Sequence, residues 1–221
     1  MTAEVKTEPA HRIAVIDYGV NNVGSVMNAL RKVGGTPYVV DSPSELRNAS
    51  AMVLPGIGAF DAGVKNLREL GLFEVIQARV AENVPILGIC LGMQLLTKGS
   101  EEGDLEGLAL VDAHTRKLVF DAASPDERNL KVPHIGWHET RCSDDVLFEG
   151  LLAEDTRFYY VHSYHVVCND PADAIATCRY GRDIVSAFHH QRVYGVQFHP
   201  EKSHRFGLRL FANFVKLAAR G

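Results

Sequence analysis

The strongest constraint on the fold is residues 84–96, where a short apolar run passes through two glycines into a run of helix-forming residues. Residues 86–89 have the composition of a fully buried central strand, and the residues after Gly92 favour a helix. A strand can turn directly into a helix only where side chains are absent at the crowded turn, and Gly88 and Gly92 meet this requirement. The segment therefore predicts a central strand that turns at once into a helix.

The residue between these glycines, Cys90, is a candidate nucleophile. Gly88-x-Cys90-x-Gly92 is the cysteine form of the nucleophile-elbow pattern. Such a turn lifts Cys90 above the carboxyl edge of the sheet and puts its sulfur at a helix N-terminus, where the partial positive charge favours a thiolate. A buried, inert cysteine in a glycine-rich turn is the alternative. The strand-turn-helix context favours the nucleophile.

The first 98 residues alternate between strand and helix patterns. Strands are predicted at 12–16, 38–40, 51–54 and 86–89, and helices at 23–33, 61–70 and 72–82. A further short helix is predicted after Ser42, because Ser42-Pro43-Ser44-Glu45 has the capping-box pattern with proline at the first helical position. This rhythm predicts an α/β fold with a doubly wound, flavodoxin-like, mostly parallel central sheet and helices on both faces.

The second half of the chain has a different pattern, with short apolar runs separated by turn signals. Antiparallel strands that extend or flank the parallel core are predicted at 109–111, 117–120, 157–161, 174–179, 184–188 and 193–198. A last helix is predicted at 203–220 with Ser203 as its N-cap. The charged residues 100–104 are interpreted as a solvated loop. Without an internal repeat or a composition break, we expect one domain over 11–221 after a polar tail over 1–10.

Composition narrows the possible partners and compartments. With 27 acidic and 23 basic residues the formal net charge is −4, which argues against nucleic acid or an anionic membrane as a partner. The four cysteines show neither C-x-x-C spacing nor a disulfide pattern, so a reducing, cytoplasmic setting is expected. The N-terminus lacks the apolar stretch of a signal peptide, and no 18-residue apolar run predicts a membrane span.

One of the ten histidines is the best candidate for a base that would serve Cys90. Pro200 forces His199 into an extended conformation, and in extended backbone residues two apart point to one face. His199 and Glu201 therefore form a histidine-carboxylate pair at the point where a strand ends and a helix begins. Alone, the segment could be a surface pair at a strand end. Together with the elbow it predicts a catalytic triad.

Two backbone amides are candidates for binding the oxyanion of an attacked carbonyl. The N–H of Leu91 is free at the first turn of the helix after Cys90, and the N–H of Ile57 lies in the glycine-rich segment 55–58 after the third strand. A phosphate-binding loop is the rival interpretation of this segment, but Val64 stands where such a loop requires lysine. His189 and His190 are adjacent and point apart in a strand, and no H-E-x-x-H is present, so neither a metal nor a cofactor is expected.

Two segments together resemble the class I (triad) glutamine amidotransferases. They are residues 88–94 around Cys90 and Phe198-His199-Pro200-Glu201. Three further stretches, 132–137, 160–164 and Lys202-Ser203, are similar to one branch of that family, the glutaminase subunits of imidazole glycerol phosphate synthase. The resemblance extends from about Ile13 to the last helix. Departures are Asn21, where many relatives have a small residue, and His138, where asparagine is usual.

The resemblance implies a thioester mechanism. The Cys90 thiolate attacks the carboxamide of L-glutamine, the Ile57 and Leu91 amides bind the oxyanion, and His199, oriented by Glu201, moves the protons. Gly56 and Gly58 border the substrate. The two ends of glutamine are bound by the side chain of Gln94 and the backbone of three consecutive residues, His162, Ser163 and Tyr164.

The resemblance also implies a partner. Ammonia passes to a separate barrel-type cyclase subunit in histidine biosynthesis, and Asn22, Trp137 and Lys202 are expected to contact it. Because Gly56 and Gly58 leave the intervening backbone free to adopt two orientations, the lone chain is expected to be a poor glutaminase that its liganded partner activates. The glutaminase of another synthase, a peptidase, a γ-glutamyl hydrolase and a non-catalytic scaffold subunit remain as alternatives.

Overall fold

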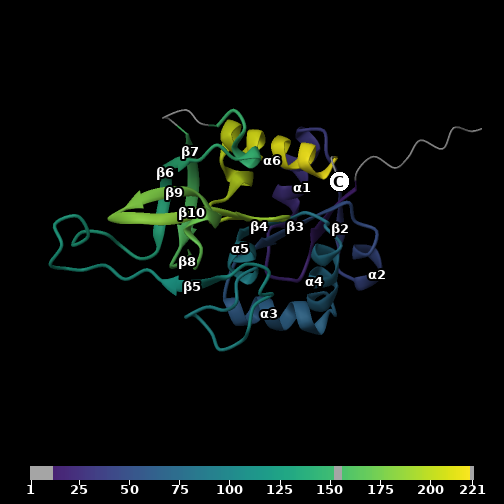
Figure 1. The fold of residues 1–221 in the computed structure, drawn as a ribbon, viewed down its shortest axis with the longest axis horizontal. Helices are drawn as coiled ribbons and strands as arrows, with labels where there is room; N and C mark the ends of the chain where they lie inside the picture. Colours follow the sequence, from purple (N-terminus) through teal and green to yellow (C-terminus); the bar gives the residue numbers. More distant parts are fainter. Residues whose placement is uncertain (1–11, 152–155, 220–221) are drawn as a thin grey trace, which may run out of the picture.

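The protein is built on a nine-stranded mixed sheet with the order β2-β1-β3-β4-β11-β10-β9-β6-β7 (Figure 1). The structure, a computed structural model, describes residues 12–151 and 156–219, so the predicted tail over 1–10 lies outside the described residues. Five neighbouring strands run parallel: β2 (Thr36–Val40), β1 (Arg12–Ile16), β3 (Ala51–Gly56), β4 (Ile86–Cys90) and β11 (Val193–Val196).

Helices cover both faces of this parallel core (Figure 1). Alternate residues of β1 enter two separate hydrophobic clusters: Ile13 and Val15 pack with one set of helices, and Ala14 and Ile16 with the other. This two-sided burial confirms the predicted doubly wound, flavodoxin-like sheet. One face is covered by α1 (Val23–Lys32) and α6 (His204–Ala218), the other by α2 (Pro43–Leu46), α3 (Phe60–Glu69), α4 (Phe73–Ala81) and α5 (Leu91–Leu95).

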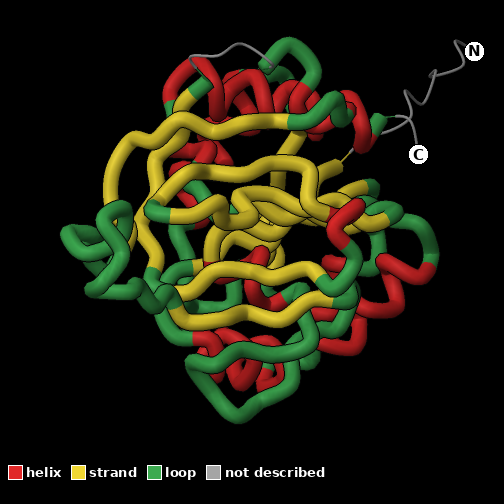
Figure 2. The backbone as a smooth tube through the Cα atoms, turned by 60° about the vertical axis from the view of Figure 1, so that its left-hand side comes forward, coloured by secondary structure: helices red, strands yellow, loops and turns green. Residues whose placement is uncertain are grey.

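The second half of the chain adds antiparallel strands, as predicted, but the predicted antiparallel strand 193–198 differs, because β11 pairs parallel with β4 and antiparallel only with β10. Figure 2 turns this extension toward the viewer. It consists of β10 (Arg182–His190), β9 (Ala174–Tyr180), β6 (His134–Cys142) and β7 (Arg157–His162), while β5 (Ala113–Lys117) and β8 (Tyr164–Cys168) pair in a separate small sheet. The short 3₁₀ helices are η1 (Val146–Phe148), η2 (Pro171–Asp173) and η3 (Pro200–Lys202).

Two predicted strands, 109–111 and 117–120, are wrong. Residues 108–110 donate backbone hydrogen bonds to the C-terminal end of α5, with Leu108 N–H to the Leu95 carbonyl at 2.8 Å and Leu110 N–H to the Leu96 carbonyl at 2.9 Å. These apolar residues therefore satisfy the unpaired carbonyls of a helix end. Of residues 117–120, only Lys117 belongs to a strand.

Strands β5, β6 and β8 were not predicted from the sequence. The residues of β6 that are fully buried, His134 and Thr140, are polar, and Trp137 is 43% exposed. Hydrophobic alternation is the signal that identifies a half-buried strand, and β6 does not have it. Its pairing with β7 and β9 determines its conformation instead.

Ser203 precedes α6 as predicted, but its hydroxyl does not cap the helix. It donates to the His199 carbonyl at 2.7 Å and accepts from the Tyr159 N–H at 3.0 Å, so it ties β7 to the segment that carries His199. The capping box at Ser42 is also not formed, because the Ser42 hydroxyl donates to the Glu45 carboxylate at 3.1 Å.

Among the helices in the described ranges, none combines the length and the apolar composition that crossing a membrane requires.

Candidate active site

Cys90 is the last residue of β4 and adopts the strained backbone conformation of a nucleophile elbow, with φ 55° and ψ −110°. A Cβ at Gly92 would lie 1.7 Å from the Leu54 carbonyl oxygen, and a Cβ at Gly88 would lie 2.7 Å from the Gly92 carbonyl carbon. Both glycines are therefore required by close backbone approach. A non-glycine residue at positive φ typically costs about 1–3 kcal/mol, which the packing around this fully enclosed strand must offset.

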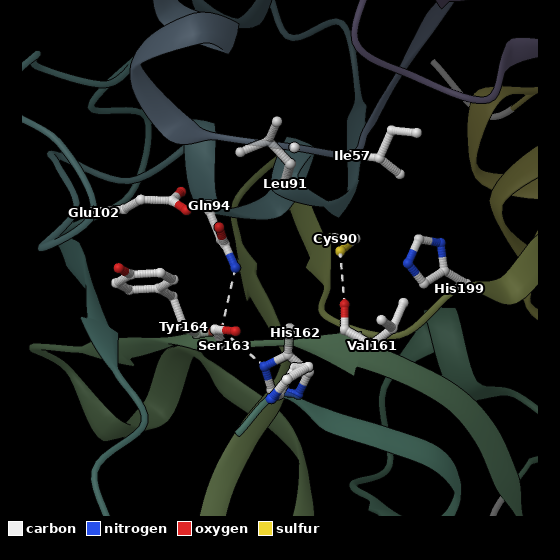
Figure 3. A pocket seen from close by; sticks show the side chains of 12 residues that line it. Ile57, Cys90, Leu91, Gln94, Glu102, Val161, His162, Ser163, Tyr164 and His199 are labelled. Atoms are coloured by element: carbon white, nitrogen blue, oxygen red, sulfur yellow. Dashed lines mark hydrogen bonds between the residues drawn. The ribbon is translucent and has the colours of Figure 1, made fainter. Parts of the chain in front are cut away.

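The strands on either side of β4 bring the other predicted groups to Cys90. Gly56, the last residue of β3, is paired with Cys90, and β11 lies on the opposite side and leads into His199. Ile57, Cys90 and His199 therefore meet at one edge of the parallel sheet, around a cavity of about 310 Å³ (Figure 3). The cavity is lined by Ile57, Gly58, Cys90, Leu91, Gln94, Glu102, Pro133, Val161, His162, Ser163, Tyr164 and His199.

His199 and Glu201 form the expected buried pair. Nδ1 of His199 lies 2.8 Å from Oε1 of Glu201, and the two side chains are only 2% and 3% exposed. Because the carboxylate only accepts, Nδ1 carries the hydrogen and Nε2 is left to act on the Cys90 side. Burial lowers the pKa of His199, but the neighbouring Cys90 sulfur and the Glu201 carboxylate outweigh it and raise the pKa to about 9. The imidazole is therefore a cation at neutral pH and can donate a proton.

Gln197 contacts Cys90, the predicted nucleophile, and was not predicted from the sequence. Its Nε2 donates to the Cys90 sulfur at 3.7 Å, and its Oε1 accepts from Nε2 of Gln94 at 3.2 Å. Gln94 also donates to the Tyr164 carbonyl at 3.2 Å. Gln197 is two residues before His199, so the same alternation that placed Glu201 beside His199 could have identified it.

The two predicted oxyanion donors are in different situations. Leu91 begins α5 directly after Cys90 and lines the cavity. The N–H of Ile57 is instead donated to the Val20 carbonyl at 2.9 Å, so in this structure it is not available to an oxyanion. Gly58 lines the cavity and has φ 101°. Gly56 is not among the residues that line the cavity; it packs against Tyr18, and a Cβ at Gly56 would lie 2.2 Å from the Tyr18 hydroxyl.

The predicted substrate contacts 162–164 form the turn between β7 and β8 and line the cavity opposite Cys90 (Figure 3). Nδ1 of His162 lies 2.8 Å from the Tyr164 carbonyl, and its Nε2 lies 2.9 Å from Nδ1 of His134. Burial lowers the pKa of His162 to about 4, so the ring is neutral. His162 therefore holds the turn in shape, and the backbone of Ser163 is presented to the cavity.

Glu102 is a second cavity residue that the sequence interpretation missed, because residues 100–104 read as a solvated loop. The backbone N–H of Phe60, at the first turn of α3, donates to Oε2 of Glu102 at 2.8 Å. The positive end of the helix dipole favours a carboxylate at this place. Figure 3 shows Glu102 at the end of the cavity occupied by Gln94 and Tyr164.

The predicted interface residues lie outside the cavity. Trp137 of β6 stacks on His204 with ring centroids 5.2 Å apart, and the Lys202 ammonium lies 5.6 Å from the centroid of the Tyr159 ring. Trp137 also contacts Tyr159 edge-on, so these residues form one half-exposed aromatic patch. Asn22 is half-buried directly before α1.

Within the described ranges, three potential metal ligands, His134, His138 and Cys178, lie close together on β6 and β9, away from the predicted triad.

Comparison with known proteins gives a consistent result. The class-I glutamine amidotransferase family model matches residues 14–217. The imidazole glycerol phosphate synthase subunit HisH 2 of Methanococcus maripaludis is 44% identical over 207 residues, which are 93% of this chain and 100% of the relative. The corresponding HisH subunit of Sulfurimonas denitrificans is 44% identical over 205 residues, which are 92% of this chain and 97% of the relative.

Solved structures show the same fold at lower identity. PurLQS from Thermotoga maritima matches with a TM-score of 0.72 at 17% identity, covering 93% of this chain and 98% of that one. A glutamine amidotransferase from Thermotoga maritima matches with a TM-score of 0.63 at 20% identity, covering 96% of this chain and 86% of that one. At these identities the likeness shows the fold alone.

Proposed function

Because the chain belongs to the class-I glutamine amidotransferase family, we propose that it is the glutaminase subunit of an imidazole glycerol phosphate synthase. It hydrolyses L-glutamine to glutamate and ammonia, and the ammonia serves a separate cyclase subunit that makes imidazole glycerol phosphate and AICAR in histidine biosynthesis. The observation that carries this proposal is the 44% identity with a HisH subunit over that relative's full length. The arrangement of Cys90 and His199 on the cavity wall, with Glu201 paired to His199, supports it.

The first half of the reaction is acylation of Cys90. Its sulfur attacks as the thiolate, the proton of the thiol being held on His199. The S–C bond forms at the carboxamide carbon of glutamine, and the carbonyl oxygen becomes an oxyanion that the Leu91 N–H can bind. Nε2 of His199, protonated at neutral pH, then donates its proton to the amide nitrogen. The C–N bond breaks, ammonia leaves, and a glutamyl thioester remains on Cys90.

The second half is hydrolysis of the thioester. His199 is now neutral at Nε2 and takes a proton from a water molecule that attacks the thioester carbon. The C–S bond breaks, glutamate leaves, and the Cys90 sulfur and the His199 cation are restored. The Glu201 carboxylate, 2.8 Å from Nδ1, keeps the ring in one tautomer and stabilises its positive charge through both halves.

The cavity has complementary groups for the two ends of glutamine. The Glu102 carboxylate, held at the start of α3, has the charge needed to bind the α-ammonium group. The side-chain amide of Gln94 and the backbone N–H groups of the turn 162–164 can bind the α-carboxylate. This arrangement leaves the side-chain carboxamide to reach Cys90, so the enzyme recognises a free amino acid rather than a peptide.

The proposed partner is the cyclase subunit, and the aromatic patch of Trp137, Tyr159 and Lys202 is the proposed contact together with Asn22. Aromatic residues are enriched at protein interfaces, and Trp137 is 43% exposed here.

The four cysteines are free thiols, which fits the reducing cytoplasm that we propose as the compartment of this protein.

The test is reconstitution with a cyclase subunit. The two chains should co-purify and make imidazole glycerol phosphate from glutamine. Cys90→Ala should abolish glutamine-dependent synthesis but leave synthesis from added ammonium salt, because ammonia reaches the cyclase without the triad. Cys142→Ala, a thiol outside the cavity, should keep both activities. Retention of glutamine-dependent synthesis in Cys90→Ala would contradict the assignment of the nucleophile, and failure to associate with the cyclase would favour another synthase.

A further inference from the structure

Two histidines of β6 and a cysteine of β9 form a cluster outside the triad. The ligand atoms of His134, His138 and Cys178 all lie within 4.8 Å of one another. His134 and His138 are four residues apart in a strand and so lie on one face, and β9 places Cys178 opposite Thr140 on that same face. His134 and Cys178 are buried, and half-buried His138 gives access from solvent.

The hydrogen bonds around His134 determine where its hydrogen lies. Nδ1 of His162 is 2.8 Å from the Tyr164 carbonyl, which only accepts, so His162 carries its hydrogen on Nδ1. Nε2 of the neutral His162 ring is then an acceptor, and it is satisfied by Nδ1 of His134 at 2.9 Å. His134 therefore has its hydrogen on Nδ1 and a bare lone pair on Nε2.

This lone pair is buried and has no hydrogen-bond partner among the residues that the structure describes. A buried acceptor without a partner is destabilising, because it has lost its hydrogen bonds to water and gained none in the protein. The rings of Tyr180 and Tyr160 stack on His134, with centroids 4.0 and 4.9 Å away, and keep Nε2 in this place. A ligand that accepts the lone pair would remove this cost.

We propose that His134 Nε2, His138 and Cys178 bind Zn²⁺. Imidazole and thiolate are ligands that Zn²⁺ prefers and that Mg²⁺ and Ca²⁺ do not. A histidine that binds zinc usually donates its other ring N–H to a neighbouring acceptor. His134 does so, because its Nδ1–H is donated to Nε2 of His162. Tetrahedral zinc distances of about 2.0–2.3 Å imply ligand separations of about 3.3–3.8 Å. Ligand atoms that lie within 4.8 Å of one another therefore need to approach by at most about 1.0–1.5 Å, shared between two side chains.

Binding of Zn²⁺ at this site releases one proton from the protein. The Cys178 S–H bond breaks, a Zn–S bond forms, and the proton goes to solvent. Three protein ligands leave a fourth position for a water molecule. Since His162 lines the glutamine cavity, the metal would also fix the histidine that holds the turn 162–164. This site could not be predicted from local sequence patterns, because its ligands come from two strands, β6 and β9, and form no local motif.

The test uses Co²⁺ as a spectroscopic stand-in for Zn²⁺ in the full-length Cys90→Ala protein, which removes the other cysteine-histidine pair. Co²⁺ should produce a thiolate-to-cobalt charge-transfer band, and Zn²⁺ should abolish it. The band should disappear when Cys178→Ser is added to this parent. It should persist when Cys142→Ser is added instead, because Cys142 is a half-buried cysteine at the end of β6, the strand of the two histidines, and is not a proposed ligand. Absence of the band in the parent, or its survival in Cys178→Ser, would overturn the proposal in favour of a metal-free aromatic core.

A second variant guards against misfolding of Cys178→Ser. His138 is half-buried, so His138→Asn should leave the fold intact, as checked by near-ultraviolet circular dichroism. Its Zn²⁺ affinity, measured by competition with a chromophoric chelator, should fall at least about tenfold. Equal Zn²⁺ affinity in parent and variant would show that His138 is not a ligand and that the site as proposed is wrong.

Discussion

The hydrogen bond from the Ile57 N–H to the Val20 carbonyl suggests how the rate of glutamine hydrolysis is controlled. While this 2.9 Å bond exists, the oxyanion can use Leu91 but not Ile57. The peptide between Gly56 and Ile57 must turn before Ile57 can contribute, and glycines on both sides allow it to do so. We predict that the liganded cyclase subunit favours the turned orientation and so activates ammonia release.

The size of the activation follows from two energies. One oxyanion donor is worth about 10²–10³ in rate, or about 2.7–4 kcal/mol. Turning the peptide breaks the bond to Val20 and leaves that carbonyl without its donor, at a cost of about 1–3 kcal/mol. The cost of turning the peptide is the smaller of these two energies and limits the activation. The lone subunit can reach the turned state by spending that energy, so the partner can increase its rate by no more than the corresponding factor. The expected activation through this peptide is therefore about 5- to 150-fold.

Two substitutions at one position isolate this effect. Ile57→Pro removes the N–H, so the liganded complex should lose about 10²–10³ in rate and most of its activation ratio. Ile57→Ala keeps the N–H and should be activated like the wild type. The assay is steady-state ammonia release at saturating glutamine, by the lone subunit and by the liganded complex. A wild-type ratio close to one, or a full ratio in Ile57→Pro, would refute the reasoning.

Three further predictions concern the triad and its surroundings. The raised pKa of His199 should stabilise the fold fully below about pH 6.5, with the stabilisation lost as pH rises through about 9; Glu201→Gln should shift this loss to lower pH in urea unfolding. Gln197→Met removes a donor to the Cys90 sulfur and should lower kcat/KM for glutamine about tenfold or more, and an unchanged kcat/KM would count against its role. Trp137→Ala and Lys202→Ala should reduce imidazole glycerol phosphate formed per glutamine hydrolysed while leaving the unfolding midpoint little changed; equal yields in wild type and variants would remove them from the proposed interface.

The parts of the site that could be predicted are those encoded locally. Gly88, Cys90 and Gly92 determine their own turn, because the steric requirement lies within five consecutive residues. His199 and Glu201 are likewise two residues apart in a segment that Pro200 keeps extended. The predicted boundaries of β1 agree with the structure for a related reason, since its apolar run is buried on both faces.

The parts that could not be predicted depend on pairing between distant segments. Glu102 reaches the cavity only because α3 holds its carboxylate, and nothing in the composition of its loop indicates this. β6 has polar residues at its buried positions, so hydrophobic alternation could not reveal it. His134 meets Cys178 because β9 pairs beside β6, a register that no local pattern encodes.

The antiparallel extension connects the proposed interface to the triad through Tyr159. Its ring contacts both Trp137 and the Lys202 ammonium, so a partner that covers the aromatic patch must also act on Tyr159. Its carbonyl accepts the His199 N–H at 2.8 Å, and its N–H donates to the Ser203 hydroxyl, which in turn donates to the His199 carbonyl at 2.7 Å. A shift of β7 at this point therefore moves the backbone of His199, the proposed catalytic histidine, directly. Contacts made at the surface patch can reach the triad across a single residue, without any change in the parallel core that holds Cys90.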